Sequence, residues 1–179
     1  GVYHVLLGEA DIASAKMRSQ AGGYDLLAAN RELAGAEIEL VQEIAREMRL
    51  KNALALVADD YDYILIDCPP TLTLLTLNGL VAADGVLVPM VCEYYALEGI
   101  SDLVATVRKI RTAINPKLGI FGIVRTLYNN QNRLAQDVSA QLQEHFGAQL
   151  FATTIPRNVR LAEAPSHGLP ALAYDAKAK

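Results

Sequence analysis

The sequence contains no tryptophan, only two cysteines and only three histidines among its 179 residues. His4, His145 and His167 are scattered along the chain and have no companion cysteines, so a zinc site is not expected. Cys68 and Cys92 each follow a predicted buried strand, and we interpret both as reduced thiols that pack rather than react. These scarcities argue against a domain organised by disulfides or by zinc.

Long apolar runs, a signal peptide and an excess of basic residues are also missing. No apolar stretch reaches transmembrane length, so no membrane partner is predicted. The formal net charge of −4 argues against a protein that coats nucleic acid with its whole surface, although it leaves room for a local basic patch. Without repeats, low-complexity runs or a linker, residues 1–179 are predicted to form a single domain.

Three common active-site motifs are absent as well. No G-x-x-x-x-G-K-[ST] phosphate loop occurs, because no lysine of the chain follows a glycine-rich turn. The dinucleotide-binding fingerprint and the G-x-S-x-G elbow are missing too. Composition and spacing alone therefore indicate an α/β domain without a complete catalytic motif.

The most informative stretch is residues 61–70, which read YDYILIDCPP. The run from Ile64 to Ile66 has no polar member, which is typical of a parallel strand buried on both faces. Pro69 and Pro70 lack backbone donors, so the strand must end there. Asp67 is therefore predicted at the carboxyl end of a central strand, where open α/β sheets form their ligand crevice.

Two interpretations of Asp67 remain open at this point. An apolar strand that ends in aspartate is the Walker B arrangement, whose carboxylate holds Mg²⁺ beside the phosphates of a nucleotide. Alternatively, Asp67 caps a turn or the next helix.

Strands and helices are predicted to alternate along the chain, which favours an α/β fold with a largely parallel, doubly wound sheet. Besides the central strand, we expect strands at residues 24–28, 85–90, 118–126 and 150–155, with a final extended piece at 169–174. Helices are expected at residues 1–8, 11–17, 33–48, 50–58, 72–83, 96–114 and 134–146, and a short one ends near Ala164. The cations Arg108, Lys109 and Arg111 complement a helix dipole or, alternatively, form a phosphate-binding patch.

Four blocks of the sequence resemble the ParA-type partition ATPases, a family of P-loop NTPases with a deviant phosphate loop. Residues 62–70 are similar to the Walker B segment of that family, and residues 30–40 to the segment before it. Residues 92–99 (CEYYALEG) and 155–166 (IPRNVRLAEAPS) match two further signatures nearly letter for letter. The resemblance covers the chain from Gly1 to Lys179 and implies a P-loop NTPase fold truncated at both ends.

The resemblance assigns expected roles to individual residues. Asp67 is expected to be the Walker B carboxylate, which organises Mg²⁺ through water, and thus the catalytic residue present in this chain. Pro156, Arg157 and Asn158 are expected beside the adenine base of ATP, although a strand end and a capped helix also explain Pro156. Arg160 is expected to contact DNA phosphates. In the loop after residue 126, Asn129 and Gln131 stand where the family usually has an aspartate and a DNA-contacting arginine. Arg133, two residues further on, is the expected substitute for that arginine.

As a whole, the resemblance implies a chromosome- or plasmid-partitioning ATPase in the cytoplasm, associated with the nucleoid. Such a protein dimerises with ATP, binds DNA without sequence preference, and hydrolyses ATP when a ParB-type partner stimulates it. The family's lysine–glycine–glycine phosphate loop is expected upstream of Gly1, so the 179-residue chain is expected to be inactive alone. The alternatives are a non-catalytic module that acts through protein–protein contacts and, less favoured by the four blocks, a membrane-targeted MinD-type sibling.

Overall fold

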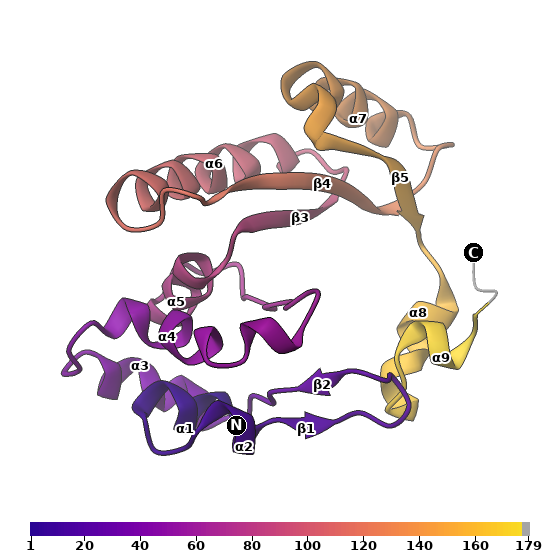
Figure 1. Ribbon diagram of the computed structural model, residues 1–179. Coiled ribbons are helices and arrows are strands. Elements are labelled where there is room, and N and C mark those ends of the chain that lie inside the picture. Colours follow the sequence, from indigo (N-terminus) through magenta and orange to yellow (C-terminus); the bar gives the residue numbers. More distant parts are fainter. Residues whose placement is uncertain (177–179) are drawn as a thin grey trace. The chain divides into compact units, whose positions relative to one another are not determined.

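The computed structural model describes residues 1–176, and these divide into two compact units. The first unit runs from Gly1 to Asp84 and the second begins at Gly85. Figure 1 shows the chain coloured along its sequence. The organisation of the chain as one domain stays a prediction. Within the described residues, no helix combines the length and the apolarity that a membrane span needs.

The second unit contains a sheet of three parallel strands. Its strands are β3 (Gly85–Val91), β4 (Gly119–Tyr128) and β5 (Leu150–Pro156), hydrogen-bonded in that order. Helix α6 (Ala96–Ala113) connects β3 to β4, and helix α7 (Arg133–Phe146) connects β4 to β5. Both helices lie on the same face of the sheet in Figure 1. The predicted α/β class with a parallel sheet is confirmed.

The core of the second unit lies between this sheet and the two helices. It is formed by Val88, Met90, Cys92, Ile100, Ile123, Ala135, Val138, Leu142 and Leu150. The members from α7 are three or four residues apart, so they share one face of the helix. Asn132 begins α7 by accepting a hydrogen bond from the backbone N–H of Ala135. The predicted strands at 85–90, 118–126 and 150–155 and the predicted helices at 96–114 and 134–146 are confirmed within a few residues.

After β5 the chain forms three short helical segments. These are α8 (Val159–Glu163), η4 (Ala164–His167) and α9 (Ala171–Tyr174). The prediction of an extended piece at residues 169–174 is therefore wrong. Pro170 supplies the N-terminal cap position of α9, and the N–H groups of Ala173 and Tyr174 both donate to its carbonyl. A proline at this point starts a turn of helix instead of excluding one.

The first unit is built mainly of short helices around two small apolar clusters. Its helices are α1 (Val2–Leu7), α2 (Ile12–Ala15), α3 (Leu33–Leu40), η1 (Arg46–Met48), α4 (Arg49–Ala55), η2 (Ala58–Asp60) and α5 (Leu74–Ala82). One cluster is formed by Leu6, Ala36, Leu40 and Leu50, and the other by Val5, Ile12 and Val57. The strands β1 (Met17–Arg18) and β2 (Asp25–Leu26) pair in an antiparallel hairpin. Met17 thus lies in a strand, not at the end of a helix.

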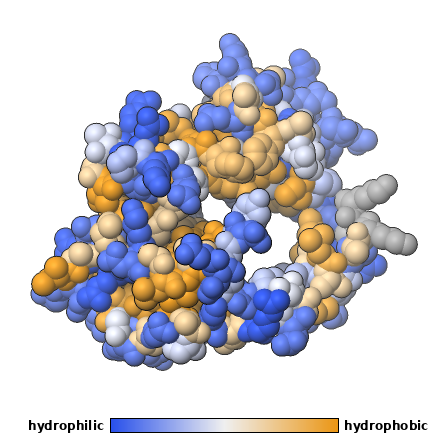
Figure 2. Space-filling view, viewed as in Figure 1, coloured by the Kyte–Doolittle hydropathy of each residue, from blue (hydrophilic) through white to orange (hydrophobic). Residues whose placement is uncertain are grey.

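The helix predicted over residues 33–48 ends early. Helix α3 stops at Leu40, and Ala45 adopts a left-handed conformation with φ of 51°. This break turns Val41 and Ile44 outward, and Ile44 is 91% exposed. Apolar residues at helical spacing predicted a continuous helix here, but the periodicity could not reveal the break. In Figure 2, apolar side chains are visible at the surface among polar ones.

The buried central strand predicted at Ile64–Ile66 is not formed in the structure. Residues 63–69 have no regular secondary structure, and Tyr63 and Leu65 are 87% and 92% exposed. Only Ile66 packs partly against the core of α1, α3 and α4. A β-strand needs a neighbour to satisfy its backbone hydrogen bonds, and no strand of the described residues pairs with this segment. The apolar run alone could not show whether such a neighbour exists.

A buried asparagine holds two helices of the first unit together. Asn78 on α5 is fully buried, and its Oδ1 accepts a hydrogen bond of 3.1 Å from the backbone N–H of Leu50 on α4. Its Nδ2 donates to the carbonyl oxygens of Arg46 at 2.8 Å and Leu74 at 3.0 Å. All polar atoms of this side chain therefore have partners, as burial demands.

We predict that Asn78→Ala lowers the free energy of unfolding by about 2–4 kcal/mol, because it leaves buried backbone groups without partners and opens a small cavity. Urea denaturation followed by circular dichroism measures the change. Asn52→Ala, on the exposed face of α4, is the matched control and should change stability by less than about 0.5 kcal/mol. Equal effects of the two substitutions would contradict the structural role of Asn78.

Candidate functional site

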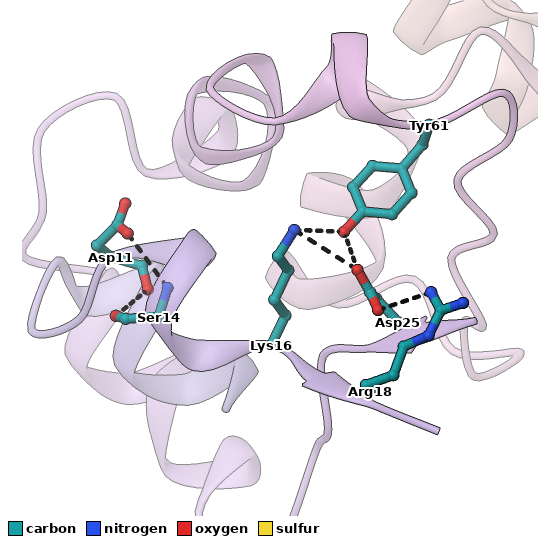
Figure 3. Close-up of polar contacts among 6 residues, drawn as sticks. All are labelled: Asp11, Ser14, Lys16, Arg18, Asp25 and Tyr61. Carbon is teal, nitrogen blue, oxygen red and sulfur yellow. Dashed lines mark hydrogen bonds and ion pairs between the residues drawn. The ribbon is translucent and has the colours of Figure 1, made fainter. Parts of the chain in front are cut away.

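The segment that carries Asp67 is held at its beginning by a polar cluster in the first unit. The hydroxyl of Tyr61 donates a hydrogen bond of 2.5 Å to Asp25 on β2 and accepts one of 2.6 Å from Lys16 (Figure 3). Asp25 also forms ion pairs with Lys16 at 3.5 Å and with Arg18 at 3.1 Å. The cluster ties Tyr61 to the β1–β2 hairpin, six residues before Asp67.

The shared hydroxyl shifts two pKa values in opposite directions. The hydrogen bond from Tyr61 lowers the pKa of Asp25, with Arg18 as the next cause, and the hydrogen bond to Tyr61 raises the pKa of Lys16. A lowered carboxyl pKa contributes stability above the pKa of the unfolded chain, and this contribution is lost as the pH falls through the folded value. The cluster is therefore intact at neutral pH and loosens in acid.

Close packing against α5 holds the other end of the segment. A Cβ atom on Gly79 would lie 2.8 Å from the Sγ atom of Cys68 and 3.4 Å from Cγ2 of Ile66. Only glycine lets the backbone of α5 approach the segment this closely. The packing thus requires a glycine at this position of α5.

Asp67 lies between these two anchors with its side chain at the surface. Its carboxylate makes no hydrogen bond or ion pair with any residue that the structure describes. No group of three His, Cys, Asp or Glu side chains that could hold a metal ion occurs in the same part of the chain. A single free carboxylate suits Mg²⁺, which keeps several waters and takes its other ligands from nucleotide phosphates.

In the second unit, the predicted nucleotide and DNA residues follow the carboxyl ends of neighbouring strands. Thr126 pairs with Ile155 and Tyr128 with Pro156, so the ends of β4 and β5 meet at one edge of the sheet. Arg157 and Asn158 follow β5 directly, and Arg133 begins α7 four residues beyond the loop start at Asn129. Ligands of open α/β sheets bind at this edge.

Sequence reasoning missed Arg125, which ties β4 to β5 and α7. Its guanidinium donates hydrogen bonds to Ser139 Oγ on α7 at 2.7 Å and to the carbonyls of Phe151 and Ala152 on β5 at 2.9 and 3.2 Å. The guanidinium also lies 5.4 Å from the ring centroid of Tyr128. An arginine within an otherwise apolar predicted strand was the available signal.

The arginines predicted to bind nucleotide or DNA differ in whether they form ion pairs with the described residues. Arg133 and Arg157 are exposed and form no ion pair within residues 1–176. Arg160 on α8 is paired with carboxylates instead. Asn158 begins α8, because its side chain accepts a hydrogen bond from the backbone N–H of Arg160. The structure thus brings Pro156, Arg157, Asn158 and Arg160 together after β5, whereas Asp67 belongs to the other unit.

A parallel α/β sheet whose loops gather at the carboxyl ends of its strands is common to several nucleotide-binding folds, and that of the P-loop NTPases is one of them. The family model of the AAA domain matches residues 1–120. The chain is similar to the chromosome-partitioning ATPase Soj of Treponema pallidum, at 49% identity over 98% of this chain and 70% of that protein. It is also 44% identical to the chromosome partitioning protein ParA of Caulobacter vibrioides, over 98% of this chain and 67% of that protein.

Among solved structures, the chain resembles cobyrinic acid a,c-diamide synthase from Mycobacterium smegmatis with a bound ATP analogue and magnesium. The TM-score is 0.81 and the identity 38%, over 97% of this chain and 68% of that one. The chain therefore belongs to the ParA/Soj family of ATPases, and it spans about two thirds of the length of these relatives. The expected resemblance to the partition ATPases is confirmed.

We predict that Asp67 suppresses the reactivity of its neighbour Cys68. Burial is the main cause that raises the pKa of the Cys68 thiol, and the negative charge of Asp67 raises it further. Asp67→Asn removes the second cause, so the pKa falls and the thiolate fraction at pH 8 rises. The rate of iodoacetamide alkylation of Cys68, followed by peptide mass spectrometry, should increase.

Asp62→Asn, an exposed aspartate of the same segment, is the matched control and should leave the alkylation rate of Cys68 unchanged. If Asp67→Asn and the parent protein have the same pH profile of alkylation, the two side chains do not interact as described.

Proposed function

We propose that this chain forms the Walker B and DNA-facing part of a chromosome- or plasmid-partitioning ATPase. The observation that supports this most directly is the 44–49% identity with partition ATPases over nearly the whole chain. In this proposal, the protein dimerises with ATP, binds DNA without sequence preference in the cytoplasm, and is stimulated by a ParB-type partner to hydrolyse ATP.

Asp67 is the residue proposed to organise Mg²⁺ through water. Its free, exposed carboxylate supports this role, and so does the bound magnesium in the M. smegmatis relative. When bound, Mg²⁺ neutralises charge that develops on the transferred phosphoryl group. The proposed task of this chain is to hold the carboxylate in place, through the Tyr61 cluster on one side and the Cys68–Gly79 contact on the other.

Pro156, Arg157 and Asn158 are proposed to contact the adenine base. They lie at the carboxyl end of β5 and in the connection that leaves it, at the ligand-binding edge of the sheet, which supports the role. Arg125 ties β4 to the first half of β5, the strand from which this connection leaves, through the carbonyls of Phe151 and Ala152.

Arg160 and Arg133 are proposed to contact DNA phosphates. Both side chains lie at the surface and carry charges that bind a backbone without reading bases. Non-specific binding of this kind suits a protein whose overall charge is negative, because only one face needs to be basic.

A non-catalytic module that acts through protein–protein contacts is the second candidate. It is favoured by the absence of a phosphate loop from these 179 residues. The intact mass of the native protein separates the two candidates: a product with a glycine-rich phosphate loop before Gly1 supports the ATPase, and a product that begins near Gly1 supports the module.

We predict that the purified 179-residue chain releases no phosphate from ATP, because the lysine and the amide cradle of a phosphate loop are not among its residues. In a protein that also carries the loop, Asp67→Asn should lower kcat by at least about tenfold, since one carboxylate that orients the metal is lost. Phosphate release measures both effects, with Asp62→Asn as the control. Turnover by the chain alone that disappears in Asp67→Asn would contradict the proposal.

We also predict that Arg160→Ala weakens binding of the ATP-bound protein to all DNA sequences alike and lowers the salt slope by roughly one. Fluorescence anisotropy with two duplexes of unrelated sequence, over a series of salt concentrations, measures both quantities. Lys117→Ala removes an exposed cation between α6 and β4, and it is the control for the loss of one positive charge. An unchanged slope for Arg160→Ala would remove this residue from the DNA surface.

A further inference from the structure

Arg160 is the predicted DNA contact that the structure shows engaged by its own chain. Its Nη1 atom lies 3.0 Å from Oε2 of Glu163, one turn further along α8, and its Nε atom lies 3.8 Å from Oδ2 of Asp175. The hydroxyl of Tyr174 donates a hydrogen bond of 3.3 Å to the same Glu163 oxygen. We call the four residues Arg160, Glu163, Tyr174 and Asp175 the Arg160 cluster.

The chain reverses direction after α8 and thereby completes this cluster. Gly168 adopts a left-handed conformation with φ of 64°, and its N–H donates to the carbonyl of Pro165. The ring of His167 stacks on that of Tyr174, with centroids 4.9 Å apart and an interplanar angle of 22°. Tyr174 and Asp175 are thus brought back to α8 by a built turn.

The ion pairs of Arg160 set it apart from the neighbouring arginines. Arg157, three residues earlier, and Arg133 on α7 have no ion pair within the described residues. The pKa of Arg160 is raised, chiefly by its hydrogen bond to Glu163. The chain therefore holds the side chain of Arg160 in ion pairs with its own carboxylates, whereas the side chains of Arg157 and Arg133 form no ion pair with the described residues.

A guanidinium presents the same N–H donors to a carboxylate and to a phosphate. Donors that face Glu163 and Asp175 cannot at the same time form the best geometry with a DNA phosphate. We propose that Glu163, Tyr174 and Asp175 form an intramolecular latch that competes with DNA for Arg160 and so sets the DNA affinity of the protein. The inference rests on the proposed function, in which Arg160 contacts DNA.

The latch tunes DNA affinity and does not act as an on–off switch. The side chains of Arg160, Glu163 and Asp175 are 56%, 40% and 36% exposed, and ion pairs this accessible are weak. Opening the latch should accordingly tighten DNA binding by roughly two- to fivefold. Such a range suits a protein that must leave DNA as readily as it binds.

A double-mutant cycle in the full-length, ATP-bound protein tests the latch. Non-specific duplex DNA is the probe, and anisotropy gives the Kd of the parent protein, Glu163→Gln, Arg160→Ala and the double variant. Glu163→Gln should tighten binding two- to fivefold in the parent and change nothing when Arg160 is already alanine. Tyr174→Phe and Asp175→Asn should each tighten binding by less, because they remove outer contacts of the cluster.

Glu144→Gln, on an exposed position of α7, is the control for the loss of one negative charge. Equal tightening by Glu163→Gln in the parent and in Arg160→Ala would show a general charge effect and overturn the latch. Weaker binding by Glu163→Gln would overturn it as well, because the pair would then orient Arg160 toward DNA. If Glu163→Gln fails to fold by circular dichroism, the same cycle with Asp175→Asn decides.

Failure of the latch is distinguishable from failure of the proposed function. The proposed role of Arg160 in DNA binding is overturned if the ATP-bound parent protein does not bind DNA, or if Arg160→Ala binds DNA as tightly as the parent. The latch is then overturned as well, because it depends on that role. If Arg160→Ala weakens binding but Glu163→Gln has no effect in the parent, only the latch is overturned. Hydrogen exchange at Nε of Arg160, followed by NMR, reports the ion pairs without DNA and should be faster in Asp175→Asn than in Glu144→Gln.

Discussion

Backbone pairing between parallel strands is the constraint on which the second unit depends. The strands β3, β4 and β5 satisfy one another's hydrogen-bonding groups, so their carboxyl ends meet at one edge of the sheet. The connections that carry Arg133 and residues 156–160 both leave from that edge. Arg125 on β4 adds side-chain hydrogen bonds to β5 and to α7. The sheet therefore places both groups of functional candidates at the same edge.

The segment that carries Asp67 shows what happens without such pairing. It has no regular secondary structure and is mostly exposed, and it is held by contacts near its two ends. Tyr61 is held by Lys16 and Asp25, and Cys68 packs on Gly79. Anchors of this kind fix where the segment begins and ends, whereas the exposed middle gains little from burial. The carboxylate of Asp67 lies between these two anchors, where it can bind a metal ion that takes its other ligands from water and phosphates.

Much of the fold followed from sequence periodicity, and the misses have physical causes. Residues 85–90, 96–114 and 134–146 were predicted well, because the strand run was long and apolar and the helices were strongly amphipathic. The helix over 33–48 was predicted too long, because the left-handed Ala45 leaves no mark on the apolar pattern. The roles of Asn78 and Gly79 were not predicted, since they depend on hydrogen bonds to Leu50 and Arg46, 28 and 32 residues away, and on a close approach to Cys68.

By itself the sequence determined the α/β class, the family and the chemical identity of the candidate residues, because these depend on local patterns and on which side chains are present. Only the tertiary structure decided which of those residues are free and which are occupied. Asp67 and Arg133 face solvent without ion pairs in the described chain, whereas Arg160 is held by Glu163 and Asp175. The reason is that an ion pair depends on where the chain turns back, and the turn at Gly168 brings Asp175 to Arg160 across a sequence separation that no local pattern records.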